Sequence, residues 1–512
     1  MDALPVLDHY LWSLNLNGNF QVSKEEKNLK KAIAVGAIWV TLLRLAYRFI
    51  GLISTVILAR LLAPEDFGVA AIAMSIFALI NAFSKFGFET VIVQHKNPSA
   101  DHYNTAWTFN MLFGVLAAVL LALFSSFIGD FYKNPDIAYV AVVISLLFLL
   151  NGVKNTGIVD FQKNMTFDKE FKLHIIPKFI SFFVTIGLAI YFKNFWALVV
   201  GNVVLKALEV ANSFIMHSFR PTFSFKRGKE LFGFSKWLMA NNMLTFLNTK
   251  SPELILGKII SPHAAAIFNL SAEIGKMATS EIIANLNRAI YPGYAKVASD
   301  LLKLQKLYKD SIRAISLIVM PLGVGVALVS PYIVPIMLGD QWAEAIEPVT
   351  YLALGGAINA LKSNSNYVYF SLGKPRIATA ELLVRAVVFI GAIVYFVNES
   401  GVVGAAQSFL MTSIIMFFVS NAVLRVVLKI PLREQIGLYI KPLISTLIMA
   451  ATVSLVIDTF TFDSVVLDLV LAVLSGATSY IMSVGVVWLI TGKKDGLEKS
   501  ALNILRAKLK RV

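Results

Sequence analysis

The sequence has no cysteine, few charged residues and no recognisable catalytic motif. Only 15% of its 512 residues are charged, whereas a soluble domain usually carries about 25%. Without cysteine the chain cannot form disulfides or thiolate metal sites, and its 6 histidines do not cluster at metal-ligand spacing. It also lacks a glycine loop ending in GK[ST] and an HExxH motif. We therefore expect a protein that is not an enzyme, with no cofactor, no metal and no ATP hydrolysis.

Long apolar segments fill most of the chain instead. Hydrophobic residues make up 57% of it, and uncharged runs such as 469–490 exceed the roughly 20 residues that cross a bilayer core. Runs bounded by proline, glycine and charge predict an all-α polytopic membrane protein with about 14 transmembrane helices. The first, seventh, eighth and tenth spans are the most polar. The predicted spans are 32–62, 66–85, 104–128, 137–157, 170–192, 195–217, 231–257, 263–292, 309–330, 343–371, 376–397, 402–425, 439–457 and 465–490.

The basic residues are distributed as in a membrane protein. The formal net charge is +15, which could indicate a nucleic-acid partner. However, the lysines and arginines lie in short loops between the apolar spans. One side of the predicted membrane collects 31 of them, the other collects 4, and 11 remain inside spans. This bias predicts a multi-pass protein of the inner (cytoplasmic) membrane with both termini in the cytoplasm, and no nucleic-acid partner.

An internal repeat relates the two halves of the chain. Residues 57–64 (ILARLLAP) match residues 255–262 (ILGKIISP) at an offset of 198 residues. A weaker match, 128–132 with 338–342, follows the third and ninth spans. Six spans separate the copies, so both halves enter the membrane from the same side, which predicts parallel six-helix lobes with a site between them. The predicted division is 1–31, a cytoplasmic extension; 32–220, the N-terminal lobe; 221–428, the C-terminal lobe; 429–492, two additional helices; and 493–512, a basic cytoplasmic tail.

One stretch of sequence carries a family resemblance. Residues 59–68 (ARLLAPEDFG), followed by 85–89 (KFGFE) and by Gln94 seven residues after Gly87, resemble the polysaccharide-transporter (Wzx-type) family of the multidrug/oligosaccharidyl-lipid/polysaccharide exporter superfamily. The resemblance extends over most of the chain from about Lys30.

This resemblance implies an architecture and a cargo. Two six-helix lobes would surround a central cavity and alternate their access to the two sides of the membrane. The cargo would be an undecaprenyl-diphosphate-linked oligosaccharide repeat unit, moved to the outer leaflet for surface polysaccharide assembly. Transport is expected to be coupled to an ion, for example by antiport. The expected partners besides the cargo are membrane lipids and, as a candidate, the polysaccharide polymerase or export machinery.

Charges inside the predicted spans mark the candidate substrate site. A charge in hydrocarbon costs at least ~2.5 kcal/mol, so it faces the bundle interior, pairs or snorkels. Arg44 and Arg48 share one face of the first span, which contains no acidic residue. Two guanidinium groups one turn apart suit a diphosphate, although acids from another helix could pair with them instead. The other candidates for diphosphate or glycan contact are Lys250, Lys276, Asn241, Asn248, Asn269 and Lys362.

Other charged residues inside the predicted spans allow more than one interpretation. Glu273 and Glu281 are candidates for ion coupling, because a carboxylate in a cavity can carry a proton; Glu273 could instead pair with Lys276. Lys206 with Glu209, and Glu381 with Arg385, have the spacing of structural ion pairs. Lys178 is expected to snorkel. The asparagine-rich faces could equally hydrogen-bond neighbouring helices.

Two other functions are compatible with a polytopic membrane protein. A multidrug or other small-molecule exporter of the same superfamily would carry cations, and its lumen would be rich in acids. A membrane polysaccharide polymerase or ligase would present a large external loop with basic and histidine residues. The predicted external loops are short and poor in charge.

Overall fold

The computed structural model describes residues 24–84, 86–460 and 462–490, and these contain helices but no strands. The helices are α2 (Lys24–Leu61), α3 (Pro64–Ser84), α4 (Phe88–Gln94), α5 (Ala100–Leu123), α6 (Ser125–Tyr132), α7 (Pro135–Val153), η1 (Thr156–Ile158), α8 (Val159–Lys163), α9 (Phe167–Phe192), α10 (Trp196–Met216), α11 (Gly228–Thr249), α12 (Ser251–Ile259), α13 (Pro262–Val297), α14 (Leu301–Leu338), η2 (Asp340–Ala345), α15 (Ile346–Ser371), α16 (Pro375–Val427), α17 (Leu432–Thr459) and α18 (Val465–Ile490).

These helices cover all the predicted spans. In the described part of the chain, ten helices are long and apolar enough to cross a membrane. The polar helices α11, α13 and α15 are not among them, so the count of 14 stays a prediction. The eleventh and twelfth spans form one helix, α16, which bends at Ser400 and Gly401; Gly401 has a φ of 60°, which glycine adopts readily. Several boundaries differ: α2 begins at Lys24 rather than at residue 32, and α5 ends at Leu123 rather than at 128.

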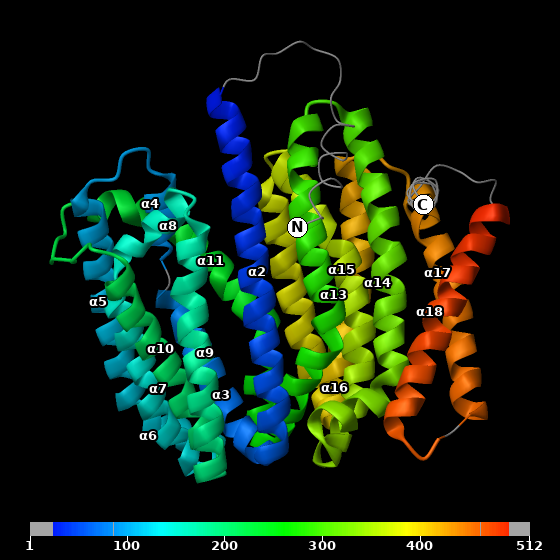
Figure 1. The fold of residues 1–512 in the computed structure, drawn as a ribbon, viewed down its shortest axis with the longest axis horizontal. Coiled ribbons are helices and arrows are strands. Elements are labelled where there is room, and N and C mark those ends of the chain that lie inside the picture. The colour runs from blue at the N-terminus through cyan, green and yellow to red at the C-terminus, as the bar shows by residue number, and fades with distance from the viewer. Residues whose placement is uncertain (1–23, 85, 461, 491–512) are drawn as a thin grey trace, which may run out of the picture.

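The helices form two groups with α2 between them (Figure 1). We call α2–α10 the first half and α11–α16 the second half, following the predicted division, which remains a prediction. Helix α2 packs on α9 and also contacts α14 of the second half. Helices α17 and α18 pack on each other and on α14 at the edge of the bundle. Residues 1–23 of the predicted extension and the predicted tail 493–512 lie outside the described residues.

Proline fixes the equivalent turn in each half. Pro64 is the first residue of α3 and Pro262 the first of α13, where a missing N–H removes no helical hydrogen bond. Ser261 caps α13 by accepting a hydrogen bond from the Ala264 N–H at 3.2 Å. Both turns lie at the lower edge of Figure 1. We call this edge the outer face and the opposite edge the inner face, following the orientation that the charge bias predicts.

At the inner face, Asp300 begins α14. Its carboxylate accepts a hydrogen bond from the Lys303 N–H at 3.1 Å, and this bond lowers the pKa of Asp300. The carboxylate therefore stays ionised as an N-cap for a helix that runs to Leu338.

Candidate functional site

The two halves are joined at the outer face by reciprocal contacts. Arg60, at the end of α2, donates to the carbonyl oxygen of Ile336 in the last turn of α14 at 2.5 Å. Its repeat equivalent Lys258, at the end of α12, donates to the carbonyl oxygen of Phe131 in the last turn of α6. Carbonyls in a last turn lack helical partners and carry partial negative charge, so cations stabilise them. Each half thus caps a helix of the other half.

Aromatic residues of the second pair of repeated segments, 128–132 and 338–342, also donate hydrogen bonds from one half to the other. The Trp342 indole N–H donates to the Ala59 carbonyl at 2.9 Å, and the Tyr132 hydroxyl donates to the Leu254 carbonyl at 3.4 Å. His263, in the first turn of α13, contacts Glu65 in the first turn of α3 and Glu344 of η2. We call this set the outer lock: Arg60, Lys258, Tyr132, Trp342, Glu65, His263 and Glu344.

Deeper in the bundle, charged side chains of α2, α9 and α13 face one another. The central charged site consists of Arg44, Arg48, Lys178, Glu273, Glu281 and Arg288. Arg48 lies ten residues beyond Ile38, where the apolar part of α2 begins, which is ~15 Å along the helix and half of a ~30 Å hydrocarbon core. Its Nε is 3.8 Å from Oε1 of Glu281. For Arg48, α13 thus supplies the acid from another helix that the sequence allows as the alternative to cargo contact.

Glu273 lies among cations rather than beside Lys276 alone. It is within electrostatic range of Arg48, Lys178 and Lys250. No ion pair joins it to Lys276 in the described part of the chain. Lys178 is directed at α2 instead of snorkelling, since its Nζ lies 4.9 Å from the centre of the Tyr47 ring.

Arg44 has a different environment from Arg48. It is exposed on α2, and among the described residues no carboxylate lies within ion-pair distance of it. Across the site it acts electrostatically on Arg288 of α13, which is also exposed and also lacks a carboxylate partner there. Two arginines from different halves are therefore within electrostatic range of each other, and neither has an ion-pair partner among the described residues.

Two predicted contact residues bind a buried carboxylate. Glu253, on α12, accepts hydrogen bonds from Lys250 Nζ at 2.8 Å and from Asn269 Nδ2 at 2.5 Å. It also accepts one from the Ser75 hydroxyl of α3 at 2.5 Å. Its side chain is 4% exposed. Lys250 and Asn269 thus support a junction between the halves, centred on Glu253, which no pattern in the sequence marks as its centre.

Lys276 and Arg385 form a second cationic pair in the second half. Lys276 Nζ lies 4.5 Å from the Phe409 ring centre, and the Arg385 guanidinium carbon lies 5.5 Å from it. Arg385 donates to Oδ1 of Asn359. The predicted pairing of Glu381 with Arg385 is wrong. The carboxylate bonds to Lys362 instead, at 3.0 Å.

The remaining candidates differ in exposure. Lys362 and Glu381 are buried, with side chains 8% and 3% exposed, so Lys362 is placed as a structural residue. Asn248 is buried and donates to the Leu244 and Leu382 carbonyls, which joins α11 to α16. Asn241 is exposed on α11.

Lys206 and Glu209 form the expected structural pair on α10. The Lys206 Nζ and Glu209 Oε2 atoms are 2.7 Å apart. His174 of α9 contacts the same carboxylate at 3.7 Å, so the pair also joins two helices.

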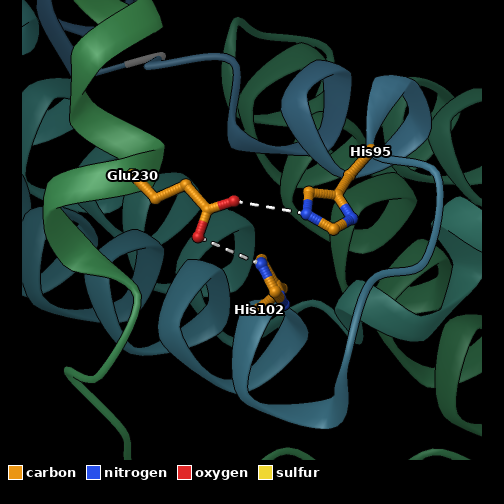
Figure 2. A group of neighbouring side chains, drawn as sticks. All are labelled: His95, His102 and Glu230. Carbon is orange, nitrogen blue, oxygen red and sulfur yellow. Dashed lines mark ion pairs between the residues drawn. The ribbon is translucent and has the colours of Figure 1, made fainter.

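One cluster at the inner face has residue types that could bind a metal. His95 and His102 of the first half surround Glu230 of α11, with ligand atoms within 4.8 Å of one another (Figure 2). However, Nδ1 of His102 accepts the Ser99 backbone N–H at 3.0 Å. A neutral His102 must then carry its proton on Nε2, the nitrogen that faces Glu230 at 3.3 Å, and has no lone pair there for a metal. The geometry fits a polar contact between the halves, in which each histidine Nε2 lies 3.3 Å from a Glu230 oxygen.

Comparison with known proteins agrees with this architecture. The family described as polysaccharide biosynthesis protein matches residues 57–347. The lipopolysaccharide biosynthesis protein WzxC of Escherichia coli K12 is 24% identical over 394 residues, covering 76% of this chain and 80% of that protein. The teichuronic acid biosynthesis protein TuaB of Bacillus subtilis 168 is 22% identical over 466 residues, covering 89% and 95%.

Solved structures of transporters share the fold. The lipid II flippase MurJ in an inward closed conformation matches with a TM-score of 0.71 and 15% identity, covering 88% of this chain and 99% of that chain. An inward-facing multidrug resistance transporter of the MATE family matches with a TM-score of 0.57 and 12% identity, covering 77% and 99%. Since the family match covers more than half of its length, this chain belongs to the polysaccharide biosynthesis protein family and is a multi-pass membrane transporter rather than an enzyme.

Proposed function

We propose that this transporter is a flippase. Its cargo would be an undecaprenyl-diphosphate-linked oligosaccharide, which it moves from the inner to the outer leaflet by alternating access between its two halves. Named relatives act in lipopolysaccharide and teichuronic acid biosynthesis, and the fold is shared with a lipid II flippase. These proteins support the class of cargo.

The electrostatic proximity of Arg44 and Arg288 carries the proposal. Two exposed arginines of α2 and α13 lie within electrostatic range of each other, and neither has an acid partner in the described part of the chain. Arg44 lies six residues beyond Ile38, which is ~9 Å into the apolar part of the helix. Like charges at that depth repel and are poorly solvated. An anionic cargo would offset both effects, and a diphosphate offers oxygens that two guanidinium groups can bind bidentately.

The charge balance of the site argues against a cationic cargo. The central charged site contains four cations (Arg44, Arg48, Lys178 and Arg288) and two carboxylates (Glu273 and Glu281). A drug cation would enter a region of net positive charge. An anionic headgroup would be attracted to it, with the carboxylates limiting how tightly it is held.

The observed contacts support one state of an alternating-access cycle. The outer lock holds the halves together at the outer face. In the proposed cycle this state is closed to the outside and receives cargo from the inner leaflet. Glu273 and Glu281 remain candidates for ion coupling. Glu281 lies 3.8 Å from Arg48 and Glu273 is within its electrostatic range, and Arg48 would change partners as cargo arrives.

Export in cells tests the proposal. We expect deletion of the gene to cause accumulation of a lipid-linked oligosaccharide on the inner side of the membrane. The wild-type gene should restore export, whereas the Arg44→Gln, Arg288→Gln double variant should lower it at least tenfold at equal membrane abundance. Lysine at both positions should restore part of the activity, because charge remains while bidentate geometry is lost.

Arg313→Gln is a matched control. Arg313 is an exposed arginine bound to Asp310 at 3.1 Å, three residues away on α14. Its loss should leave export unchanged. Full export by the Arg44→Gln, Arg288→Gln variant would overturn the proposed diphosphate site. Absence of any lipid-linked intermediate in the deletion strain would overturn the proposed function itself.

A further inference from the structure

His263 lies between carboxylates of both halves at the outer face. Its Nδ1 is 2.9 Å from Oε1 of Glu65 on α3, and its Nε2 is 3.0 Å from Oε2 of Glu344 in η2. Glu65 is the residue that corresponds to His263 at the repeat offset of 198. The contact therefore joins equivalent positions of the two halves, where they meet.

The number of available hydrogens decides the protonation state. An ionised carboxylate only accepts hydrogen bonds, and a neutral imidazole has one N–H. Both contacts can be satisfied only if both ring nitrogens carry hydrogen or one carboxyl group is protonated. Either way, the closed arrangement contains one proton more than a neutral histidine with two carboxylates.

We propose that the closed outer lock binds this proton at His263, and that its release to the outside permits the halves to separate there. The inference deepens the proposed function, on which it rests for its role in transport, by assigning a proton-binding site to the outer lock. The site is distinct from the coupling candidates Glu273 and Glu281 in the central charged site. A neutral His263 retains one hydrogen bond and leaves the second carboxylate without a donor.

The other charged groups near His263 are already engaged or acidic. Asp66 of α3 accepts the Phe195 N–H at 2.9 Å and the Ala63 N–H at 3.2 Å. Arg60 and Lys258 donate to main-chain carbonyls. The further ionisable groups on the adjoining elements are Asp136 of α7, Asp340 of η2 and Glu347 of α15. A cationic imidazole is thus the positive partner available to Glu65 and Glu344.

The direction of the pH effect follows from the extra proton that the closed arrangement contains. Protons bind preferentially to the closed lock, so low pH favours closure and rising pH favours opening. Histidine changes its charge between roughly pH 5 and 8. For one proton, the ratio of closed to open molecules changes by at most about tenfold per pH unit.

The inner-face cluster provides an internal comparison. There Nδ1 of His102 accepts a backbone N–H, and Nε2 of each histidine faces Glu230. Two neutral imidazoles can each direct an N–H toward that carboxylate at 3.3 Å, so these contacts require no added proton. Substitution of His102 should therefore leave the pH response of the outer face intact.

Distances between spin labels at the outer face test the proposal. The chain has no cysteine, so Lys133→Cys and Asn398→Cys label one exposed position in each half of the full-length protein without other changes. In lipid nanodiscs without cargo, we expect the short-distance population to fall as pH rises from 5 to 8. His263→Gln should abolish this dependence and lower the short-distance population throughout. His263→Arg, a permanent cation, should keep it high at both pH values, and His102→Gln should respond as wild type.

Two results would overturn the proposal: a wild-type distance distribution that is the same at pH 5 and pH 8, or a His263→Gln protein that keeps the wild-type pH response. The measurement uses no cargo. A failure of the proposed diphosphate site would therefore appear in the export assay and leave the distance measurement unchanged. A failure of the proposed proton site would appear in the distance measurement and leave the diphosphate site untouched.

Discussion

Gly68 and Pro262 approach each other so closely that a Cβ atom on Gly68 would lie 1.9 Å from the Pro262 carbonyl oxygen. Gly68 lies one turn into α3, and Pro262 begins α13. Only glycine allows the two helices to meet at this distance. The closed outer face therefore depends on a missing side chain as well as on the charged contacts.

Alanine at position 68 is expected to force the halves apart at the outer face. The obstructing atom belongs to the backbone and cannot rotate away, so α3 or α13 must shift. Spin labels at positions 133 and 398 should report a smaller short-distance population for Gly68→Ala than for wild type, and export should fall. Gly51→Ala is the control, since a Cβ atom there meets nothing within 4 Å. An unchanged distance distribution for Gly68→Ala would contradict the close approach.

The two capping cations should act on the same equilibrium. Arg60→Gln and Lys258→Gln each remove a cation from a helix C-terminus of the other half. Such contacts contribute about 0.3–1 kcal/mol when exposed, so each variant should reduce the closed population by up to about fivefold. The double variant should show roughly the product of the two effects. Lys306→Gln, an exposed lysine of α14 at the inner face, should have no effect. Closed populations that do not change in either single variant would refute this role.

The Lys362–Glu381 pair should matter for stability and not for cargo. Lys362→Met leaves a buried carboxylate without its cation, which costs roughly 3–5 kcal/mol. The purified protein should therefore unfold at a markedly lower temperature. Adding Glu381→Gln to this variant removes the unpaired charge and should recover much of the lost stability. The Tyr369 hydroxyl donates to Glu381 Oε1 in the wild type and can donate to the amide oxygen of the glutamine instead. A single variant that is stable but defective in export would show that Lys362 acts on cargo after all.

The inner-face cluster should not retain zinc. If His102 donates its Nε2 hydrogen to Glu230, chelator treatment should leave the unfolding temperature unchanged and purified protein should contain no stoichiometric zinc. His102→Ala should lower stability, because Glu230 loses a polar contact and Ser99 loses its acceptor. Zinc bound at one equivalent in wild type and absent from His102→Ala would instead establish a metal site.

The sequence predicted the parts of the fold that depend on local chemistry. Pro64 and Pro262 start helices, as expected for a residue without an N–H, and the apolar runs became helices. Even the polar helices α11, α13 and α15 were found. Hydropathy alone does not identify them, but the alternation of basic loops requires a span at each of those places.

Partners across helices were much harder to predict. Glu381 is four residues from Arg385, yet it bonds to Lys362 of α15. Arg48 has no acid on its own helix and meets Glu281 of α13. Spacing along one helix identifies residues on a shared face but not the side chains that the neighbouring helix brings to it. The repeat offset was the one long-range signal available, and applied to Glu65 it would have indicated His263.

The acceptors for Arg60 and Lys258 are carbonyl oxygens of the main chain, at Ile336 and Phe131. Every amino acid supplies such an oxygen, so the identity of residues 336 and 131 is free to drift during evolution while the contact persists. Among related proteins we expect a basic residue at the positions of Arg60 and Lys258, without any covarying acidic residue opposite. Searches for coevolving charge pairs would then overlook this junction, although it fastens the two halves together.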